Sequence, residues 1–251
     1  PMRFAWRTHD YVERESIGGV QGAVLPLLLT YVRLWDVVSS GRVDQFIANS
    51  HEVAGRIRRF YQREAQIIPP PVDLPPYTAQ PAQDYYLAGG RLIPYKRLEL
   101  AVQAFNQLGL PLKIFGDGRD RATLQAQARP NIEFLGWVDE CQRRALFAGC
   151  RAFVFPGMED FGITPLEAMA AGRPVIAFAG GGALDTVIEG VTGRFFRQHT
   201  AAALAAAVAT SRCDTYDSVQ IRRHAEGFGQ TVFTARMQAS IDQTLARRPS
   251  L

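Results

Sequence analysis

The sequence predicts an α/β fold in which a doubly wound parallel sheet follows a smaller, partial domain. Two observations indicate this class. From residue 85 to residue 197, short apolar runs alternate with amphipathic stretches of helical length, which is typical of parallel strands joined by helices. A proline-rich run at residues 69–76 precedes this alternation. Because such a run can be neither a helix nor a central strand, we expect it to separate two domains.

Composition indicates an ordinary globular protein. The 251 residues are 47% hydrophobic and 21% charged, and this length gives room for one large or two small domains. The net charge of +4 suits an anionic ligand or membrane surface but is too diffuse for nucleic acid. The three cysteines have no metal-ligand spacing, and their odd number argues against a disulfide framework, so we expect a reducing cytoplasm. The longest apolar run, residues 23–32, is too short for a membrane span.

The N-terminal part is predicted to be mostly helical. A helix begins at Gly18-Gly19 and reaches about Ser39, and Ser50 is a good N-cap for a helix over residues 51–62. Short strands are expected at 46–50 and 65–68. Four arginines make helix 51–63 basic; it either meets a membrane surface or is a solvated charged face. The predicted divisions are 1–70, the remnant of a first domain, 71–84, a linker, 85–228, the second domain, and 229–251, a C-terminal helix.

The second domain is predicted to alternate strands and helices throughout. The expected strands are 85–89, 112–115, 132–135, 152–155, 174–178 and 193–196. The expected helices are 98–108, one ending near 128, 139–148 with Asp139 as its cap, one starting at 163–165, 183–189, and alanine-rich helices after residue 200. In such sheets ligands bind beyond the carboxyl ends of the strands, and each glycine cluster of this domain falls at such an end.

One stretch, residues 153–167, carries the strongest candidate site. An apolar run ends in Pro-Gly, Glu159 follows, and a helix begins at Ile163 with Glu167 in its early part. A helix N-terminus aims free backbone N–H groups and a positive dipole end into the loop before it. This arrangement suits a ligand with both phosphate and hydroxyl groups. Spacing alone equally allows an ordinary strand-to-helix turn with two solvated acids.

Four further loops follow predicted strands. Arg91 and Lys96, on a glycine- and proline-containing loop, either clamp a diphosphate or form a solvated basic loop. The turn Gly116-Asp117-Gly118 lacks the third glycine of a dinucleotide fingerprint. In Gly136-Trp137-Val138 the backbone either bonds a nucleobase edge or Trp137 simply packs at the sheet rim. A triple glycine at 180–182 follows the predicted strand 174–178. In a parallel sheet, all five loops converge on one crevice. The four histidines have no metal spacing, and no Gly-x-Ser-x-Gly motif is present.

Together these residues resemble the retaining glycosyltransferases of family 4, densely over residues 85–197. The resemblance rests on Arg91 and Lys96, Phe-Gly-Asp-Gly at 115–118, Phe-Leu-Gly at 134–136, the pair Glu159-x7-Glu167, Ala-Gly at 171–172, Pro-Val at 174–175, Gly-Gly at 181–182 and Glu-Gly-Val-Thr-Gly at 189–193. Residues 1–6, 44–50 and 70–73 look like the mannosyltransferase branch of lipopolysaccharide and exopolysaccharide assembly.

The resemblance implies a GT-B architecture, in which two Rossmann-like domains face each other across a cleft and the second binds the donor. Arg91 and Lys96 would neutralise the leaving diphosphate, Glu159 would accept hydrogen bonds from the sugar, and Glu167 would bind the ribose. The catalytic group would comprise Glu159, Arg91 and Lys96. The other donor-binding residues would be Gly116, Asp117, Gly136, Trp137, Val138, Phe161, Gly162, Ile163, Thr164 and Glu167. No metal or other cofactor is expected.

The implied function is transfer of a hexosyl residue, mannose from GDP-mannose, to a saccharide or lipid-linked acceptor with retention. The expected place is the cytoplasm, with a peripheral contact to the inner membrane face as one option and no nucleic acid partner. We also expect an N-terminally truncated chain, since in relatives several strands and a His-Thr pair precede the position of Pro1. The alternatives are an epimerase or phosphorylase of the same fold, and a nucleotide-sugar-binding module that is inactive alone.

Overall fold

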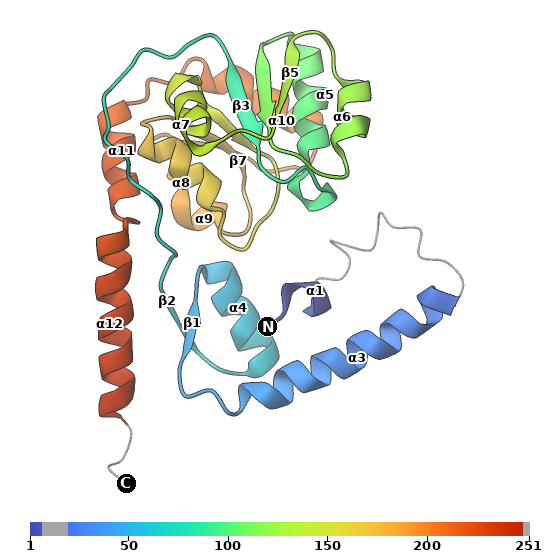
Figure 1. Cartoon of the computed structure of the whole chain (residues 1–251), viewed down its shortest axis with the longest axis vertical. Coiled ribbons are helices and arrows are strands. Elements are labelled where there is room, and N and C mark those ends of the chain that lie inside the picture. The colour runs from blue at the N-terminus through green and yellow to red at the C-terminus, as the bar shows by residue number, and fades with distance from the viewer. Residues whose placement is uncertain (7–19, 248–251) are drawn as a thin grey trace. The chain divides into compact units, whose positions relative to one another are not determined.

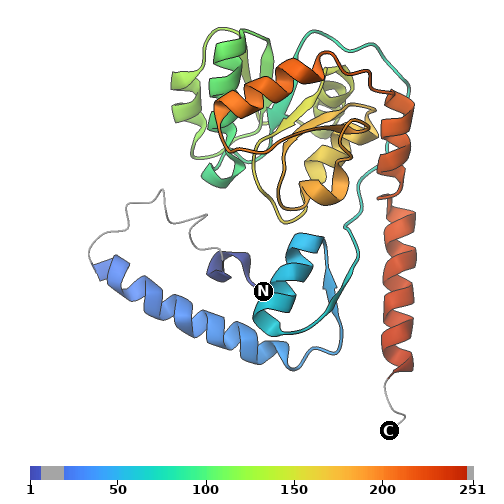
Figure 2. The same cartoon turned by 180° about the vertical axis from the view of Figure 1, so that it is seen from behind.

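The structure is a computed structural model that describes residues 1–6 and 20–247, with only the backbone described for residues 20–24. Its contacts divide it into two compact units, Pro1–Pro69 with Ala235–Leu251, and Pro70–Thr234. Figure 1 shows the chain as a ribbon, and Figure 2 shows it from behind. The predicted helix start at Gly18-Gly19 lies outside the described residues.

The first unit contains a small parallel β-α-β element. Strand β1 pairs with β2 in parallel, and helix α4 connects them. The predicted N-cap is confirmed, because the Ser50 hydroxyl accepts a hydrogen bond of 3.2 Å from the Val53 N–H. The bounds of the elements are α1 Arg3–Trp6, α3 Val20–Ser40, β1 Phe46–Ala48, α4 His51–Tyr61 and β2 Ala65–Ile67.

Helix α3 confirms the helix that the spacing of apolar residues predicts in this part of the chain. The side chains that carry this periodicity are nevertheless exposed in the described structure, with Leu27 at 73% and Tyr31 at 69%, whereas Leu29 is buried. None of the helices in the described ranges is long and apolar enough to cross a membrane.

The second unit confirms the predicted doubly wound sheet. It has six strands in the order β5-β4-β3-β6-β7-β8, and every neighbouring pair is parallel. The chain therefore starts at the centre of the sheet, moves to one edge, returns, and then builds the other edge. The strands are β3 Tyr86–Gly89, β4 Leu112–Phe115, β5 Ile132–Gly136, β6 Phe153–Phe155, β7 Val175–Phe178 and β8 Gly193–Phe196.

Alternate strand residues face opposite helical layers. Tyr86 and Ala88 belong to an apolar cluster with α5 and α10, whereas Leu87 belongs to a second cluster with α7, α8 and α11. The ribbons show these helices on the two faces of the sheet (Figures 1 and 2). Burial on both faces explains why the strands appear as short apolar runs. The helices are α5 Leu98–Leu108, α6 Arg121–Gln127, α7 Glu140–Gly149, α8 Ile163–Ala170, α9 Ala183–Thr186, α10 Ala201–Ser211, α11 Ser218–Glu226 and α12 Gln230–Ala246.

Helix α9 is shorter than expected. It ends at Thr186 rather than reaching Glu189, because Val187 is extended, with φ −94° and ψ 133°. Glu189 instead forms a bridge with Gly193 at the start of β8. The β-branched residues Val187 and Ile188 favour this early end.

The proline-rich segment, residues 70–85, is the first part of the second unit. It has neither helix nor named strand. Val72 is buried and donates its N–H to the Phe228 carbonyl at 2.9 Å. Further along, the Arg173 guanidinium donates to the Gln80 carbonyl at 2.7 Å. These contacts hold the segment against α7, α8 and α11, and so place its side chains beside the helices that follow β5 and β6.

Candidate functional site

The loops that follow β3, β4 and β5 pack backbone against backbone. The Gly116 N–H donates to the Gly136 carbonyl at 2.6 Å, and the Gly90 N–H donates to the Phe115 carbonyl at 3.1 Å. A Cβ atom on Gly116, whose φ is +104°, would lie 1.9 Å from the Gly90 carbonyl oxygen. No side chain fits there, so Gly116 has to be a glycine for these loops to meet.

The loops that follow β6 and β7 meet each other in the same way. The Gly182 N–H donates to the Glu159 carbonyl at 2.9 Å, and a Cβ on Gly182 would lie 2.2 Å from the Phe161 Cα. Gly157 joins this pair to the loop after β3, since a Cβ there would lie 2.9 Å from the Lys96 Cα. The predicted convergence of the five loops is thus confirmed for the backbone.

Lys96 and Glu159 form an ion pair at this edge of the sheet. The Lys96 ammonium binds the Glu159 Oε1, and the two side chains are only 14% and 16% exposed. Lys96 ends a short 3₁₀ turn, Pro94–Lys96, and Arg97 after it has the left-handed φ of 54°, an uncommon conformation for a residue with a side chain. Two of the three predicted catalytic residues are therefore in contact.

Arg91 stands apart from this pair. It is exposed in the loop after β3, and it makes no ion pair with another residue in the described part of the chain. Its guanidinium is free to move toward an anion that reaches this loop.

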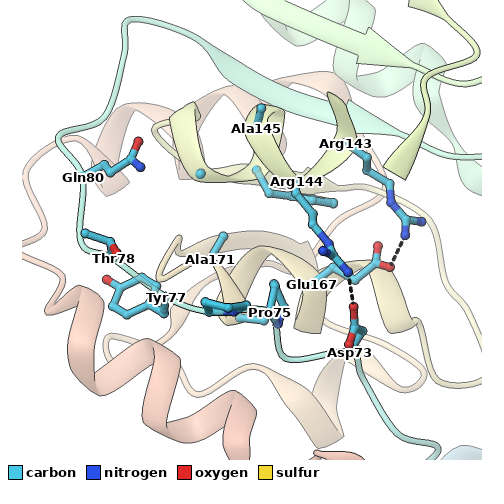
Figure 3. Close-up of a pocket in the computed structure, with 14 residues that line it drawn as sticks. Asp73, Pro75, Tyr77, Thr78, Gln80, Arg143, Arg144, Ala145, Glu167 and Ala171 are labelled. Carbon is cyan, nitrogen blue, oxygen red and sulfur yellow. Dashed lines mark hydrogen bonds and ion pairs between the residues drawn. The ribbon is translucent and has the colours of Figure 1, made fainter. Parts of the chain in front are cut away.

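Glu167 belongs to a different charge cluster. Its Oε1 lies 3.3 Å from the Arg143 Nη2, and its side chain is 19% exposed. Burial raises the pKa of Glu167, the Arg143 guanidinium opposes this, and the carboxylates of Asp73 and Glu140 add to the rise. Figure 3 shows Arg143 and Glu167 pointing toward one another from α7 and α8.

A cavity of about 360 Å³ adjoins Glu167, between segment 70–85, α7 and α8. Alanines of the two helices line it on one side, and Pro75 and Tyr77 on the other (Figure 3). Arg144 stands at its charged end, where its guanidinium pairs with Asp73 at 2.5 Å and with Glu140.

The other predicted binding residues differ in what they offer. Asp117 is engaged locally, by the Gly118 N–H at 2.8 Å and by the Arg121 guanidinium at 3.4 Å. The structure does not bring it to Glu159. Trp137 is 78% exposed, whereas Val138 packs partly buried against the cluster of α7 and α8. Arg121 also lies close to Gly136.

The start of α8 presents its backbone to the site. Helix α8 begins at Ile163, as predicted, after Gly162 with φ +82° and without a side-chain cap. Phe161 is buried and Ile163 is exposed, while Thr164 is half-buried. An uncapped helix start leaves N–H groups that an anionic ligand can accept from.

Two further residues near these loops were not predicted. Arg143 lies 24 residues before Glu167 in the sequence, and no local pattern connects them. The His199 ring follows β8 and stacks on Phe178, with ring centroids 3.4 Å apart. Burial, with a smaller effect of the Arg97 charge, lowers the pKa of His199. Its place just after a predicted strand was the available signal.

No group of three or more His, Cys, Asp or Glu side chains in the described ranges is placed to hold a metal ion. Donor binding without a metal stays a prediction.

Comparison with known proteins identifies the family. The family model described as "Glycosyl transferases group 1" matches residues 75–225, more than half of the chain. An alpha-1,3/1,6-mannosyltransferase of Dictyostelium discoideum is 49% identical over 63 residues, 25% of this chain and 15% of that protein. A GDP-mannose-dependent alpha-mannosyltransferase of Mycolicibacterium smegmatis is 44% identical over 106 residues, 41% of this chain and 28% of that protein. The matches thus span less than a third of these relatives.

Solved structures share the fold. The structure of HepE from Anabaena in complex with UDP and glucose superimposes with a TM-score of 0.75 and 20% identity, covering 84% of this chain and 66% of that one. At this identity the likeness shows the fold and no more.

Proposed function

Because this chain belongs to the group 1 glycosyl transferases, we propose that it is the donor-binding part of a retaining glycosyltransferase. It transfers a hexosyl residue, mannose from GDP-mannose, to a saccharide or lipid-linked acceptor. The observation that carries this proposal is the Lys96–Glu159 pair at the edge where five strand-end loops meet. One cation and one carboxylate in contact match a ligand that combines a phosphate with sugar hydroxyls.

The proposed chemistry is charge stabilisation on the donor. As the glycosidic bond breaks, negative charge grows on the leaving diphosphate, and Lys96 with Arg91 neutralises it. Glu159, released from Lys96 by the phosphate, accepts hydrogen bonds from the sugar hydroxyls and holds the anomeric carbon for front-face attack. The amides of Phe161, Gly162 and Ile163 contact the sugar and the phosphate, at the uncapped start of α8.

The nucleoside lies on the α7 side of the site in this proposal. Glu167 accepts hydrogen bonds from the ribose hydroxyls, and the backbone of residues 136–138 bonds the base. GDP-mannose is preferred because the Mycolicibacterium smegmatis relative is named for its dependence on it. We propose the cytoplasm as the place of action, because a reducing compartment suits the free thiols Cys141 and Cys213, which are exposed.

Calorimetric titration with GDP, GDP-mannose, UDP and UDP-glucose tests the proposal. We expect binding of GDP and GDP-mannose, weakened about tenfold or more in Lys96→Ala and in Arg91→Ala by loss of a charge-assisted contact. Lys113→Ala is the matched control, since Lys113 lies on β4 and faces Glu133 at 3.8 Å. Lack of affinity for every nucleoside diphosphate would overturn the proposal.

Product analysis separates the alternatives on the same fold. Conversion of the donor alone would indicate an epimerase, and conversion only with added inorganic phosphate would indicate a phosphorylase. A chain that binds GDP-mannose but transfers nothing to any acceptor would be a binding module.

A further inference from the structure

This inference rests on the proposed function and concerns the ribose side of the donor site. Glu167 lies on α8 with its side chain largely buried, 19% exposed. Burial disfavours a charged carboxylate, and two further carboxylates, Asp73 on segment 70–85 and Glu140 on α7, act in the same direction. Without compensation, Glu167 would take up a proton more readily than an ordinary glutamate.

The two neighbouring arginines of α7 form ion pairs with different carboxylates. Arg144 pairs with Asp73, at 2.5 Å, and with Glu140. Arg143 turns instead to Glu167, with 3.3 Å between Nη2 and Oε1, and it is the one cation paired with Glu167 among the described residues. From α11, Arg222 reaches α8 only at its far end, where it donates to the Ala170 carbonyl at 2.6 Å.

The protonation state of the Glu167 carboxyl group determines how well it can accept hydrogen bonds from two neighbouring hydroxyls. An ionised carboxylate offers two acceptor oxygens, so each ribose hydroxyl can donate to one of them. A protonated carboxyl has one oxygen occupied by its own proton and accepts less well. Orientation matters equally, because a guanidinium that holds one oxygen fixes the plane of the carboxylate.

We propose that Arg143 is a positioning residue for the nucleotide, which keeps the Glu167 carboxylate ionised and orients it toward the two ribose hydroxyls. Arg143 itself touches no part of the donor. The Arg143 side chain is 39% exposed, so water reaches the ion pair. The effect of Arg143 on nucleotide binding is greatest on the acid side, because Glu167 would otherwise be protonated there.

The expected consequence is a shift in the pH dependence of nucleotide binding. GDP affinity falls as the pH drops through the pKa of Glu167, because only the ionised form binds both hydroxyls. An opposite charge beside a carboxylate lowers the pKa of that carboxyl, so removing the Arg143 charge raises the pKa of Glu167 further. In Arg143→Gln the acid limit of binding therefore moves to higher pH, and on the acid side the affinity for GDP is lower than that of the unaltered chain. At pH 8, where the carboxylate is ionised in both chains, the difference that remains is due to the lost orientation alone.

The experiment is calorimetric titration of the full chain with GDP between pH 4.5 and pH 8. Arg143→Lys, which keeps the charge, should restore most of the acid limit. Arg151→Gln is the matched control: Arg151 is 46% exposed and pairs with Asp84 at 2.9 Å, away from Glu167, so its profile should follow that of the unaltered chain. Glu167→Gln should bind weakly with no acid limit of its own.

A second measurement needs no ligand. The carboxyl ¹³C signal of Glu167, assigned by its loss in Glu167→Gln, should titrate at a higher pH in Arg143→Gln than in the unaltered chain. If GDP binds and Arg143→Gln has the same acid limit as the unaltered chain, the role of Arg143 is overturned while the proposed function stands. If no nucleotide binds at any pH, the proposed function is overturned and this role with it, whatever the carboxyl titration shows of the ion pair.

Discussion

The ion pair between Lys96 and Glu159 makes a quantitative prediction about the ligand-free chain. In Lys96→Met the apolar stem of the side chain is kept and only the ammonium is removed, which leaves the Glu159 carboxylate largely buried without its cation. In Glu159→Gln the shape of the side chain is kept and the charge is lost. The double variant removes both charges, so the three variants form a cycle that isolates the interaction between them.

The expected size follows from the burial of the pair. Exposed ion pairs contribute about 0–1 kcal/mol, whereas removing one partner of a buried pair costs about 3–5 kcal/mol. The two side chains are 14% and 16% exposed, between these limits. We therefore expect Lys96→Met to lower the free energy of unfolding by about 2 kcal/mol. The double variant should lose less than the sum of the single changes, with a coupling of at least about 1 kcal/mol.

Urea unfolding followed by far-UV circular dichroism measures the cycle. On the proposed function, GDP adds a second reading, because a ligand at 100 times its dissociation constant raises the free energy of unfolding by about 2.7 kcal/mol. At the same GDP concentration this increment should be kept in Lys113→Met and should fall to about 1.4 kcal/mol or less in Lys96→Met, whose affinity is about tenfold weaker or more. Single changes that add within about 0.5 kcal/mol would refute the idea that the two charges depend on one another.

Two further variants test the close packing of the loops after β6 and β7 and the ion pair between Arg194 of β8 and Asp214. Gly182→Ala should lower the free energy of unfolding, measured in urea, by about 3 kcal/mol, because the new Cβ would lie 2.2 Å from the Phe161 Cα. The control Gly55→Ala, which has open space around its Cβ, should be neutral or stabilising. Equal effects of the two substitutions would contradict the close packing at Gly182. The Arg194 guanidinium, bound to Asp214 at 2.9 and 2.7 Å, lowers the pKa of that carboxyl. The stabilisation is therefore present above the unfolded pKa of about 3.9 and is lost as the pH falls through the lower folded value. The free energy of unfolding of Asp214→Asn should be about 1 kcal/mol lower than that of the unaltered chain at pH 7. This difference should narrow below pH 4, and a difference that stays the same down to pH 3 would contradict the assignment.

The strands and helices of the second unit could be predicted because their causes are local. The central strands are buried on two faces, as Leu87 and Ala88 of β3 show by belonging to opposite clusters, and so they appear as short apolar runs. Cap residues also act locally, and the capping box of Asp139 with Gln142 marks the start of α7 where the sequence predicts it. Helix α9 also ends for a local reason, because the β-branched residues Val187 and Ile188 disfavour its continuation. The prediction of a helix up to Glu189 did not take these two residues into account.

The site could be predicted only in its backbone. Glycines such as Gly116 and Gly182 are visible in the sequence, and their position at strand ends implies that their loops meet. Side-chain partners depend instead on contacts between distant parts of the chain. Lys96 and Glu159 are 63 residues apart, and Asp73 reaches Arg144 across 71 residues, because segment 70–85 docks along α7. Neither pairing has a local signature.

Glu159 and Glu167 show what that difference means for function. Their spacing along the sequence allows either one shared role or two separate ones. In the structure Gly162, with φ +82°, turns the chain between them, so that Glu159 remains with the loop after β3 while Glu167 is carried into α8. Glu159 then meets a lysine and Glu167 an arginine. Because each acid is paired with a different cation, the position of one side chain can change without breaking the ion pair of the other. This independence is what a donor with two chemically distinct halves, a sugar and a nucleoside, would require of the protein that binds it.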